Sequence, residues 1–234
     1  MAIQFSNNEK EVINTPQEIF DNFNKFIFSN DTKLFAKLVA RTLFFEEIKN
    51  VPGDIVECGV YKGSGLFTWL KLKKAVSPNA FKKIIGFDMF DSESLLNTLS
   101  GHDKETMTIL FNNRQFEYKN YDSILSQLIL NAGFDSSNFE LIQGDVSKTS
   151  EQFVSKRPGF KISLLYLDMD LEKPTYDALL HFWPRISKGG LVIFDEYGYH
   201  QWSESKGADK FANEHNLEIK ILNYNAPTAY IKKI

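Results

Sequence analysis

Cysteine is almost absent from this sequence, since Cys58 is the only one among 234 residues. A single thiol cannot form an internal disulfide, which is typical of proteins from a reducing compartment. A cysteine nucleophile would need a base partner, and the sequence shows no Cys/His motif. We therefore interpret Cys58 as a small buried residue.

Long apolar runs and an excess of positive charge are lacking as well. No run approaches the roughly 18–20 apolar residues of a membrane span. The first residues, MAIQFSNNEKEV, are polar and lack the apolar region of a signal peptide. The formal net charge of −3 argues against a nucleic-acid-binding protein. We therefore expect a cytoplasmic protein with neither a membrane nor a nucleic acid as its partner.

The composition itself is that of an ordinary globular domain, with 43% hydrophobic and 24% charged residues. Residues 1–52 show a helical pattern: Thr15-Pro16 is a cap and first-turn signal, and apolar residues then recur at helical spacing. We expect this segment to pack on a core domain formed by residues 53–234. Its phenylalanine-rich stripe favours packing within the chain, over an active site, or against a second copy in a homo-oligomer.

From Asp54 onward, short β-rich runs alternate with segments long enough for helices, which predicts a doubly wound α/β sheet. The seven expected strands are residues 54–60, 83–90, 139–146, 161–170, 191–198, 217–223 and 228–234. Only YNAP joins the last two, and so short a link permits a hairpin but no parallel crossover. We expect six parallel strands and a final antiparallel strand at the edge.

The connection between the second and third strands is long for one crossover. It contains a helical pattern at 121–133, in which Gly133 is placed as the C-cap, preceded by polar, irregular sequence. Long insertions in α/β enzymes often form lids or substrate loops. We therefore expect an insertion at about 91–121 to serve as a lid or substrate region.

Acidic residues occur at the ends of the first five expected strands. They are Glu57, Asp88, Asp145, Asp168 with Asp170, and Asp195 with Glu196. Ligands bind at the carboxyl ends of such strands, and a carboxylate beside an apolar strand costs desolvation unless it is hydrogen-bonded or metal-bound. The functional site is therefore expected at this edge.

Three of these acids, Asp168, Asp195 and Glu196, follow two consecutive strands that are expected to be neighbours. Like charges so close together raise each other's pKa or recruit a cation. An all-oxygen donor set favours a hard divalent ion, Mg²⁺, with Mn²⁺ or Ca²⁺ as alternatives. Helix N-caps are the other explanation of these residues.

Glycines follow the first strand in a G-x-x-x-G-x-G pattern at Gly59, Gly63 and Gly65, which differs from the dinucleotide pattern G-x-G-x-x-G. Glycine lets the backbone approach a ligand closely, and a following helix offers free N–H groups. Asp88 lies 23 residues beyond Gly65 and suits a grip on two ribose hydroxyls, with a helix cap as the alternative.

Six stretches together resemble the class I S-adenosylmethionine-dependent methyltransferases, and more narrowly the macrocin O-methyltransferase family (TylF/MycF/NovP type), which methylates sugar hydroxyls of antibiotics. The stretches are GDIVECGVYKGSG, GFDMFDS, LIQGDV, LDMDLEKPTYDAL, PRISKGGLVIFDEYG and GADKF. The resemblance covers roughly Gly53 to Phe211. It implies a Rossmann-like sheet and transfer of a methyl group from S-adenosylmethionine to a hydroxyl oxygen.

The resemblance also assigns roles to individual residues. It implies that the amino-acid part of the donor is bound by Glu57, Gly59, Tyr61, Gly63 and Ser64, the ribose by Asp88, the adenine by Asp145 and Val146, and Mg²⁺ by Asp168, Asp195 and Glu196. The family commonly has two aspartates where this chain has Asp195-Glu196. Asp170, beside the metal ligands without a ligand role, is the candidate general base, and His200 is the alternative.

The acceptor expected from this reading is a hydroxyl of a sugar or a glycosylated small molecule, because two neighbouring oxygens suit a metal ion. A catechol-like or other hydroxylated metabolite is the alternative. A nicotinamide oxidoreductase would require G-x-G-x-x-G, and a metal-dependent hydrolase usually has more metal ligands, often His. A nucleotide-binding protein without methyltransferase activity remains a further alternative.

Overall fold

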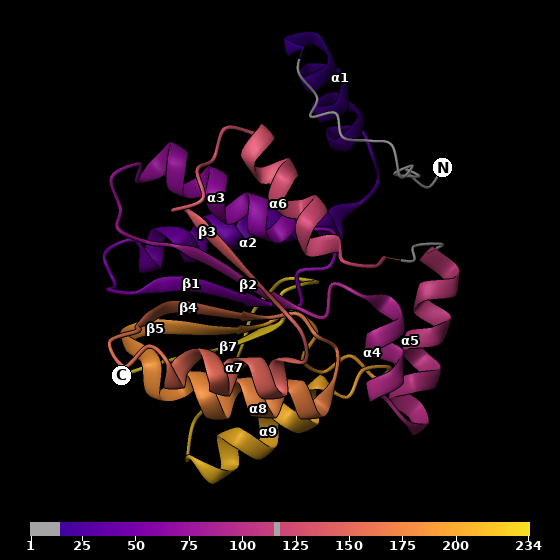
Figure 1. Ribbon diagram of the computed structural model, residues 1–234, viewed down its shortest axis with the longest axis vertical. Coiled ribbons are helices and arrows are strands. Elements are labelled where there is room, and N and C mark those ends of the chain that lie inside the picture. The colour runs from indigo at the N-terminus through magenta and orange to yellow at the C-terminus, as the bar shows by residue number, and fades with distance from the viewer. Residues whose placement is uncertain (1–14, 115–117) are drawn as a thin grey trace.

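The computed structural model describes residues 15–114 and 118–234, in which helices cover both faces of a seven-stranded sheet (Figure 1). The helices are α1 Pro16–Ile27, α2 Thr32–Ile48, α3 Ser64–Val76, α4 Ser92–Thr98, α5 Gly101–Arg114, α6 Tyr121–Asn131, α7 Val146–Ser155, α8 Glu172–Phe182 and α9 Glu204–Glu214. The strands are β1 Asp54–Cys58, β2 Ile84–Asp88, β3 Phe139–Gln143, β4 Ile162–Leu167, β5 Ile186–Phe194, β6 Lys220–Ile221 and β7 Ala229–Lys232. None of these helices is both long and apolar enough to cross a bilayer.

The sheet has the strand order β3-β2-β1-β4-β5-β7-β6, and the first five of these strands pair in parallel. The strand order reverses between β1 and β4, which is where ligands bind in open α/β sheets. β7 runs antiparallel to both neighbours, as the short YNAP link predicted. The expected edge position was wrong, because the two-residue β6 pairs along the outer side of β7.

Alternate residues of each strand feed two apolar layers. Ile55 packs with helices α2, α3 and α6 on one face, whereas Val56 packs with α7, α8 and α9 on the other. Side chains alternate along a strand, so Glu57 faces the same side as Ile55 and meets α2. Figure 1 shows the two groups of helices above and below the sheet.

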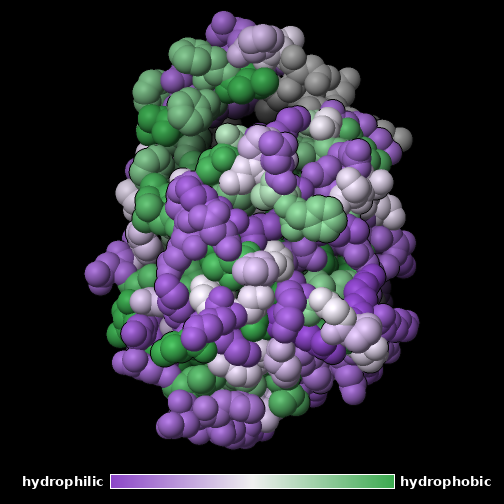
Figure 2. Space-filling view, turned by 90° about the vertical axis from the view of Figure 1, so that its left-hand side faces the viewer, coloured by the Kyte–Doolittle hydropathy of each residue, from purple (hydrophilic) through white to green (hydrophobic). Residues whose placement is uncertain are grey.

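The two N-terminal helices differ in how they contact the rest of the chain. α1 begins with the predicted cap, in which Thr15 and Glu18 form a capping box, but buries no residue. α2 buries Phe45 and Ile48 in the core. Apolar side chains are therefore exposed on α1 and directly after it, Phe20 and Phe28 among them. Figure 1 shows α1 standing away from the sheet, and Figure 2 shows hydrophobic surface in the upper part of the molecule. Residues 1–14 of the predicted helical segment lie outside the described residues.

The expected irregular insertion is instead largely helical. α4 begins where the Asp91 side chain accepts a hydrogen bond from Ser94 N, and Gly101, with φ of +55°, begins α5. The polarity of this segment hid both helices, because they expose most of their residues. α6 and the positive φ of Gly133 match the prediction. Residues 115–117 lie outside the described part.

Candidate active site

The strand ends at the reversal point carry the acids in neighbouring positions. Asp168 N donates to Cys58 O at 2.9 Å, and Asp195 N donates to Leu167 O at 3.0 Å. Asp168 and Asp195 therefore each follow directly after their strands, β4 and β5, in adjacent register. This proximity agrees with their expected place after two neighbouring strands.

Gly59 is required by a close approach between β1 and β4. Its φ is +90°, and a Cβ built on it would lie 1.9 Å from the carbonyl oxygen of Asp168. No other residue fits here without moving backbone. The glycine therefore fixes the distance between the start of the glycine-containing loop and the first strand-end acid.

Asp88 holds that loop in place. Its Oδ2 accepts hydrogen bonds from Val60 N at 2.8 Å and Tyr61 N at 2.9 Å, and its Oδ1 accepts one from Phe90 N at 2.9 Å. Both oxygens of Asp88 therefore already accept backbone hydrogen bonds, and its contact with two ribose hydroxyls stays a prediction. A donor hydroxyl would have to share them.

The loop that Asp88 holds connects β1 to α3. Tyr61 has a φ of +50° and Gly63 one of +89°, and Gly63 is the N-cap residue without a side-chain cap bond. Ser64 is the exposed first residue of α3. The structure brings these three predicted donor-binding residues together at a helix N-terminus.

Glu57 is buried against α2. Its Oε1 lies 3.4 Å from Nη2 of Arg41, which is itself buried and sits 4.4 Å from the ring centroid of Tyr166. Burial raises the pKa of Glu57, and the Arg41 charge opposes that shift. Its Oε2 is buried without a hydrogen-bond partner, and the Trp69 side chain lies near enough to lower the pKa of Glu57, so a ligand at Oε2 would have Trp69 as its neighbour. A Cβ at Gly65 would lie 2.1 Å from Glu57 Oε1, so this pair needs the glycine.

Asp168 and Asp195 converge on one lysine. Lys37 Nζ lies 2.6 Å from Asp195 Oδ2 and 3.3 Å from Asp168 Oδ2, while Tyr166 Oη donates to Asp195 Oδ1. Burial, followed by the charge of Asp195, raises the pKa of Asp168 to about 7, although Lys37 lowers it. Burial lowers the pKa of Lys37, but the two aspartates outweigh it and raise that pKa above its usual value.

Glu196 is paired elsewhere, with Lys33 at 2.5 Å. Within residues 15–114 and 118–234, no three His, Cys, Asp or Glu side chains form a metal-binding group. The expected trio of Asp168, Asp195 and Glu196 is therefore not assembled here, because two lysines divide it between them.

Two more acids face this cluster. Asp170 has a φ of +65°, which is rare outside glycine and is often found at functional sites, and its Oδ1 is buried without a partner. Glu204 is fully buried, and its Oε1 accepts a bond from Glu196 N at 3.3 Å. Burial, and next the charge of Asp170, raises the pKa of Glu204 well above its ordinary value.

In its chemistry, though not in its present arrangement, the donor set fits a hard divalent cation. Partnerless buried oxygens belong to Asp170, Glu196 and Glu204. With Asp168 and Asp195 this makes five carboxylates, against the two ammonium groups of Lys33 and Lys37. All available donors are carboxylate oxygens, which is the chemistry of Mg²⁺ or Ca²⁺ sites. Lys37 occupies Oδ2 of Asp168 and Oδ2 of Asp195, and Tyr166 holds the other Asp195 oxygen, so Asp195 can ligate such an ion only when Lys37 has moved away.

Three predicted residues have other surroundings. Asp145 is the N-cap of α7 and accepts from Ser147 N at 2.9 Å, while Val146 is buried in the core. Their contact with adenine stays a prediction. His200 is exposed in the loop after β5, and His102 Nε2 of α5 lies 3.2 Å from Gln201 O of the same loop. The insertion thus reaches the loop beside the strand-end acids.

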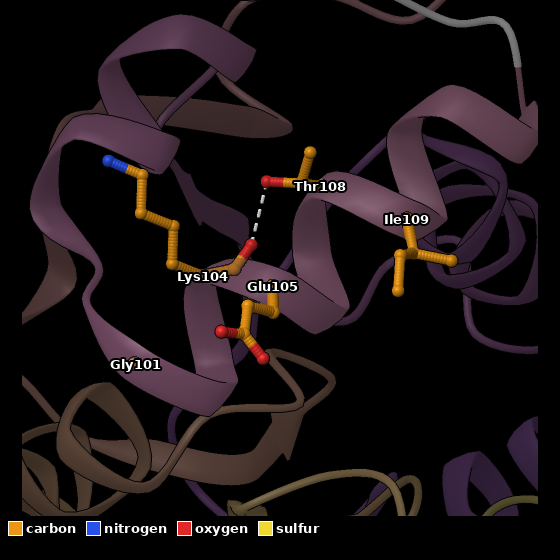
Figure 3. A pocket seen from close by; sticks show the side chains of 5 residues that line it. All are labelled: Gly101, Lys104, Glu105, Thr108 and Ile109. Carbon is orange, nitrogen blue, oxygen red and sulfur yellow. Dashed lines mark hydrogen bonds between the residues drawn. The ribbon is translucent and has the colours of Figure 1, made fainter.

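A surface pocket of about 550 Å³ on α5 contains none of the predicted site residues (Figure 3). It is lined by Gly101, Lys104, Glu105, Thr108 and Ile109. Thr108 Oγ1 donates to Lys104 O along the helix at 2.7 Å, so this contact serves the helix itself.

Sequence reasoning missed the basic partners of the acids. Lys33, Lys37 and Arg41 follow each other at a spacing of four residues, which places them on one face of α2. That spacing is visible in the sequence and was the available signal. Tyr166, inside an apolar run, gave no signal of its own.

Comparison with known proteins finds relatives of this chain. The protein is 26% identical over 150 residues to an 8-demethyl-8-(2,3-dimethoxy-alpha-L-rhamnosyl)-tetracenomycin-C 4'-O-methyltransferase of Streptomyces olivaceus. It is 25% identical over 152 residues to a demethyldecarbamoylnovobiocin O-methyltransferase of Streptomyces niveus. Each match covers 63% of this chain and 54% of the relative, so it spans about half the length of either curated protein.

The solved structure of CalS11, a TDP-rhamnose 3'-O-methyltransferase of calicheamicin biosynthesis, has the same fold. It superposes with a TM-score of 0.67 at 24% identity and covers 95% of this chain and 88% of that one. The family model of macrocin-O-methyltransferase (TylF) matches residues 45–233. The resemblance drawn from the six sequence stretches is thereby confirmed: this chain belongs to the macrocin O-methyltransferase (TylF) family.

Proposed function

We propose that this protein is an O-methyltransferase that moves the methyl group of S-adenosylmethionine to a hydroxyl of a sugar or a glycosylated small molecule. The observation that carries the proposal is the meeting of the glycine-containing loop after β1 with the carboxylates that follow β4 and β5. Family membership supports it, as do relatives whose names describe sugar-linked acceptors.

The donor pocket is proposed to lie over the ends of β1 and β2. Glu57 Oε2, buried and without a partner, is available to accept a hydrogen bond from the donor's ammonium group. The N–H groups at the uncapped start of α3, beside Gly63 and Ser64, suit its carboxylate. Gly59 and Tyr61 shape the loop, and Asp88 holds it in place.

The outer part of the donor is proposed to extend toward β3. There Asp145 and Val146 remain the candidates for the adenine, as their position at the end of the strand next to β2 allows. Asp88 already accepts hydrogen bonds from three backbone N–H groups. We propose that its carboxylate accepts hydrogen bonds from the ribose hydroxyls in addition to these three.

The general base proposed for the acceptor hydroxyl is Asp170. Its strained backbone holds Oδ1 buried and unpartnered beside Asp168. The carboxylate takes the hydroxyl proton as the oxygen forms a bond to the methyl carbon. The carbon–sulfur bond breaks at the same time, its electron pair stays on sulfur, and S-adenosylhomocysteine results. His200, exposed on its loop, is the alternative base.

A divalent cation, Mg²⁺ with Mn²⁺ or Ca²⁺ as alternatives, is proposed to be held by Asp168, Asp195 and Glu196. When bound, such an ion lowers the pKa of a hydroxyl coordinated to it. The partnerless oxygens and the surplus of carboxylates support this assignment. Glu204, which accepts a bond from the backbone of Glu196, keeps that ligand's position fixed.

The remaining partners stay predictions. A cytoplasmic location and a homo-oligomer are still expected, the latter because of the exposed aromatic side chains of α1. The lid role of the insertion is supported by the contact between His102 and Gln201.

The deciding experiment measures transfer of a labelled methyl group from S-adenosylmethionine to a panel of acceptors. Each glycoside is paired with its own sugar-free aglycone, and a catechol is included. Label in the sugar of the glycoside, with none in the matched aglycone, is expected. Label in the catechol or the aglycone would favour the alternative acceptor class. If calorimetry detects binding of neither S-adenosylmethionine nor S-adenosylhomocysteine, the methyltransferase proposal fails.

A further inference from the structure

Three basic residues form a stripe along α2. Lys33, Lys37 and Arg41 are each one helical turn apart, and α2 lies on the upper face of the sheet in Figure 1. Like charges at this spacing repel and destabilise an isolated helix. A helix with such a stripe is stable when opposite charges elsewhere in the protein neutralise it.

Each basic residue of the stripe meets a different acid at the strand ends. Lys33 pairs with Glu196, Lys37 with Asp168 and Asp195, and Arg41 with Glu57. These partners are between 16 and 163 residues away in sequence. The three basic residues therefore cover four strand-end carboxylates, and they follow the order of the strands β5, β4 and β1 across the sheet.

Lys37 lies in the centre of this match. Only 17% of its side chain is exposed, and its Nζ contacts one oxygen of Asp168 and one of fully buried Asp195. The other Asp195 oxygen is occupied by Tyr166. An ammonium group thus stands against the oxygens that would ligate a divalent ion, and two cations cannot share them at contact distance.

Lys33 repeats the arrangement less tightly at the neighbouring acid. Its side chain is 40% exposed, it lies 5.0 Å from the centroid of the Tyr199 ring, and it pairs with one oxygen of Glu196 while the other has no partner. Glu196 therefore keeps a free donor oxygen, whereas Asp195 keeps none. Displacing Lys33 should accordingly matter less than displacing Lys37.

We infer that Lys37 is a built-in counter-ion that competes with the divalent cation for Asp168 and Asp195, and so sets the affinity of the protein for that cation. In the metal-free protein it keeps the fully buried carboxylate of Asp195 and the partly exposed one of Asp168 from repelling each other, and the ion replaces it on binding. Lys33 acts in the same way, more weakly, at Glu196. This inference rests on the metal site of the proposed function but not on the identity of the acceptor.

The inference is tested by titrating MgCl₂ alone into the metal-free protein in a calorimeter, with no methyl donor or acceptor. Coupling free energies between two interacting groups of a protein typically change affinity about 5- to 150-fold, and we take this range as the scale of the expected effect. Lys37→Met should tighten Mg²⁺ binding within that range, whereas Lys37→Arg, which keeps the charge, should not. Lys33→Met, at a more exposed position, should tighten it less and guards against a Lys37 variant that fails to fold.

Lys49→Met is the matched control, because Lys49 follows the same helix but pairs with Glu46 at the surface. It should leave the affinity for Mg²⁺ unchanged. Unchanged or weaker binding by a folded Lys37→Met protein would overturn the inference, as would the same result for Lys33→Met if Lys37→Met does not fold. Tightening by Lys49→Met equal to that of Lys37→Met, or no Mg²⁺ binding by any variant, would overturn it as well. A parallel titration with S-adenosylhomocysteine keeps the two proposals apart, since donor binding would persist if only the role of Lys37 is wrong.

Discussion

Tyr166 and Asp195 are joined by a hydrogen bond of 2.5 Å between neighbouring strands β4 and β5. The Tyr166 ring also lies under the guanidinium of Arg41, which pairs with Glu57. One buried aromatic residue thus contacts the groups on either side of the reversal point in the sheet. The proposed donor site and the proposed cation site are therefore coupled through side chains that are all buried.

Tyr166→Phe should lower the free energy of unfolding by about 1.5–3 kcal/mol, because it leaves a fully buried carboxylate without its hydroxyl donor. Chemical denaturation measures the loss. The control is Tyr197→Phe, which removes a bond of 2.6 Å to Asp209 at the surface and should cost well under half as much. Equal losses would show that burial of the Tyr166–Asp195 bond is unimportant.

Gly59→Ala should be far more damaging than Gly198→Ala. Both glycines have similar positive φ values, +90° and +87°, so both variants carry the same backbone strain of about 1–2 kcal/mol. Only at Gly59 would the new methyl group also collide with the carbonyl of Asp168, at 1.9 Å. The difference between the melting temperatures of the two variants measures the cost of that collision. Equal melting temperatures would contradict the prediction.

Asp88→Ala should weaken binding of S-adenosylhomocysteine and lower the free energy of unfolding by at least about 2 kcal/mol, because three backbone N–H groups lose their acceptor. Calorimetry and denaturation give the two quantities. Asp135→Ala, which removes one exposed bond to Ser137 N, should change neither by more than about 1 kcal/mol. Unaltered donor affinity in Asp88→Ala would mean that the loop keeps its shape without this residue.

Asp170→Asn should reduce the rate of methyl transfer by about 10²- to 10⁴-fold, the usual contribution of a general base, with donor affinity preserved. His200→Ala should retain most of the rate, because His200 is exposed on its loop. Single-turnover kinetics with saturating donor separates chemistry from binding. The reverse pattern would assign the base to His200.

Adding MgCl₂ at about 100 times its dissociation constant should stabilise the protein by about 2.7 kcal/mol, which appears as a higher melting temperature that EDTA reverses. Asp168→Asn should abolish this shift. Asp177→Asn is the control, since Asp177 pairs with Lys173 on α8 away from the strand ends and should leave the shift intact. A shift that survives in Asp168→Asn would remove Asp168 from the cation site.

The sheet could be predicted from sequence because its signals are local. Apolar runs marked the strands, connection lengths separated crossovers from the final hairpin, and each strand-end acid lay directly after its run. The two-residue strand β6, by contrast, is so short and exposed that its sequence does not indicate its place in the sheet. The antiparallel strand β7 was therefore wrongly expected at the edge.

The partners of the site residues could not be predicted in the same way, because they depend on contacts between distant segments. Asp88 was expected at the end of its strand, but the three backbone N–H groups whose hydrogen bonds it accepts could not be foreseen from the sequence. Asp168 and Asp195 lay where expected, but Lys37, 131 residues before Asp168, reached them from a helix on the sheet's face. The sequence indicated where the acidic residues lie together. Only the fold showed which basic residues pair with them.

Gly65 has a consequence for any attempt to exchange parts between relatives. A Cβ there would displace the ends of the Glu57 and Arg41 side chains, 2.1 and 2.6 Å away, so positions 41, 57 and 65 are coupled across α2, β1 and α3. A chimera that imports α2 from another protein must import its matching strand residue and the small residue opposite, or lose the junction between them.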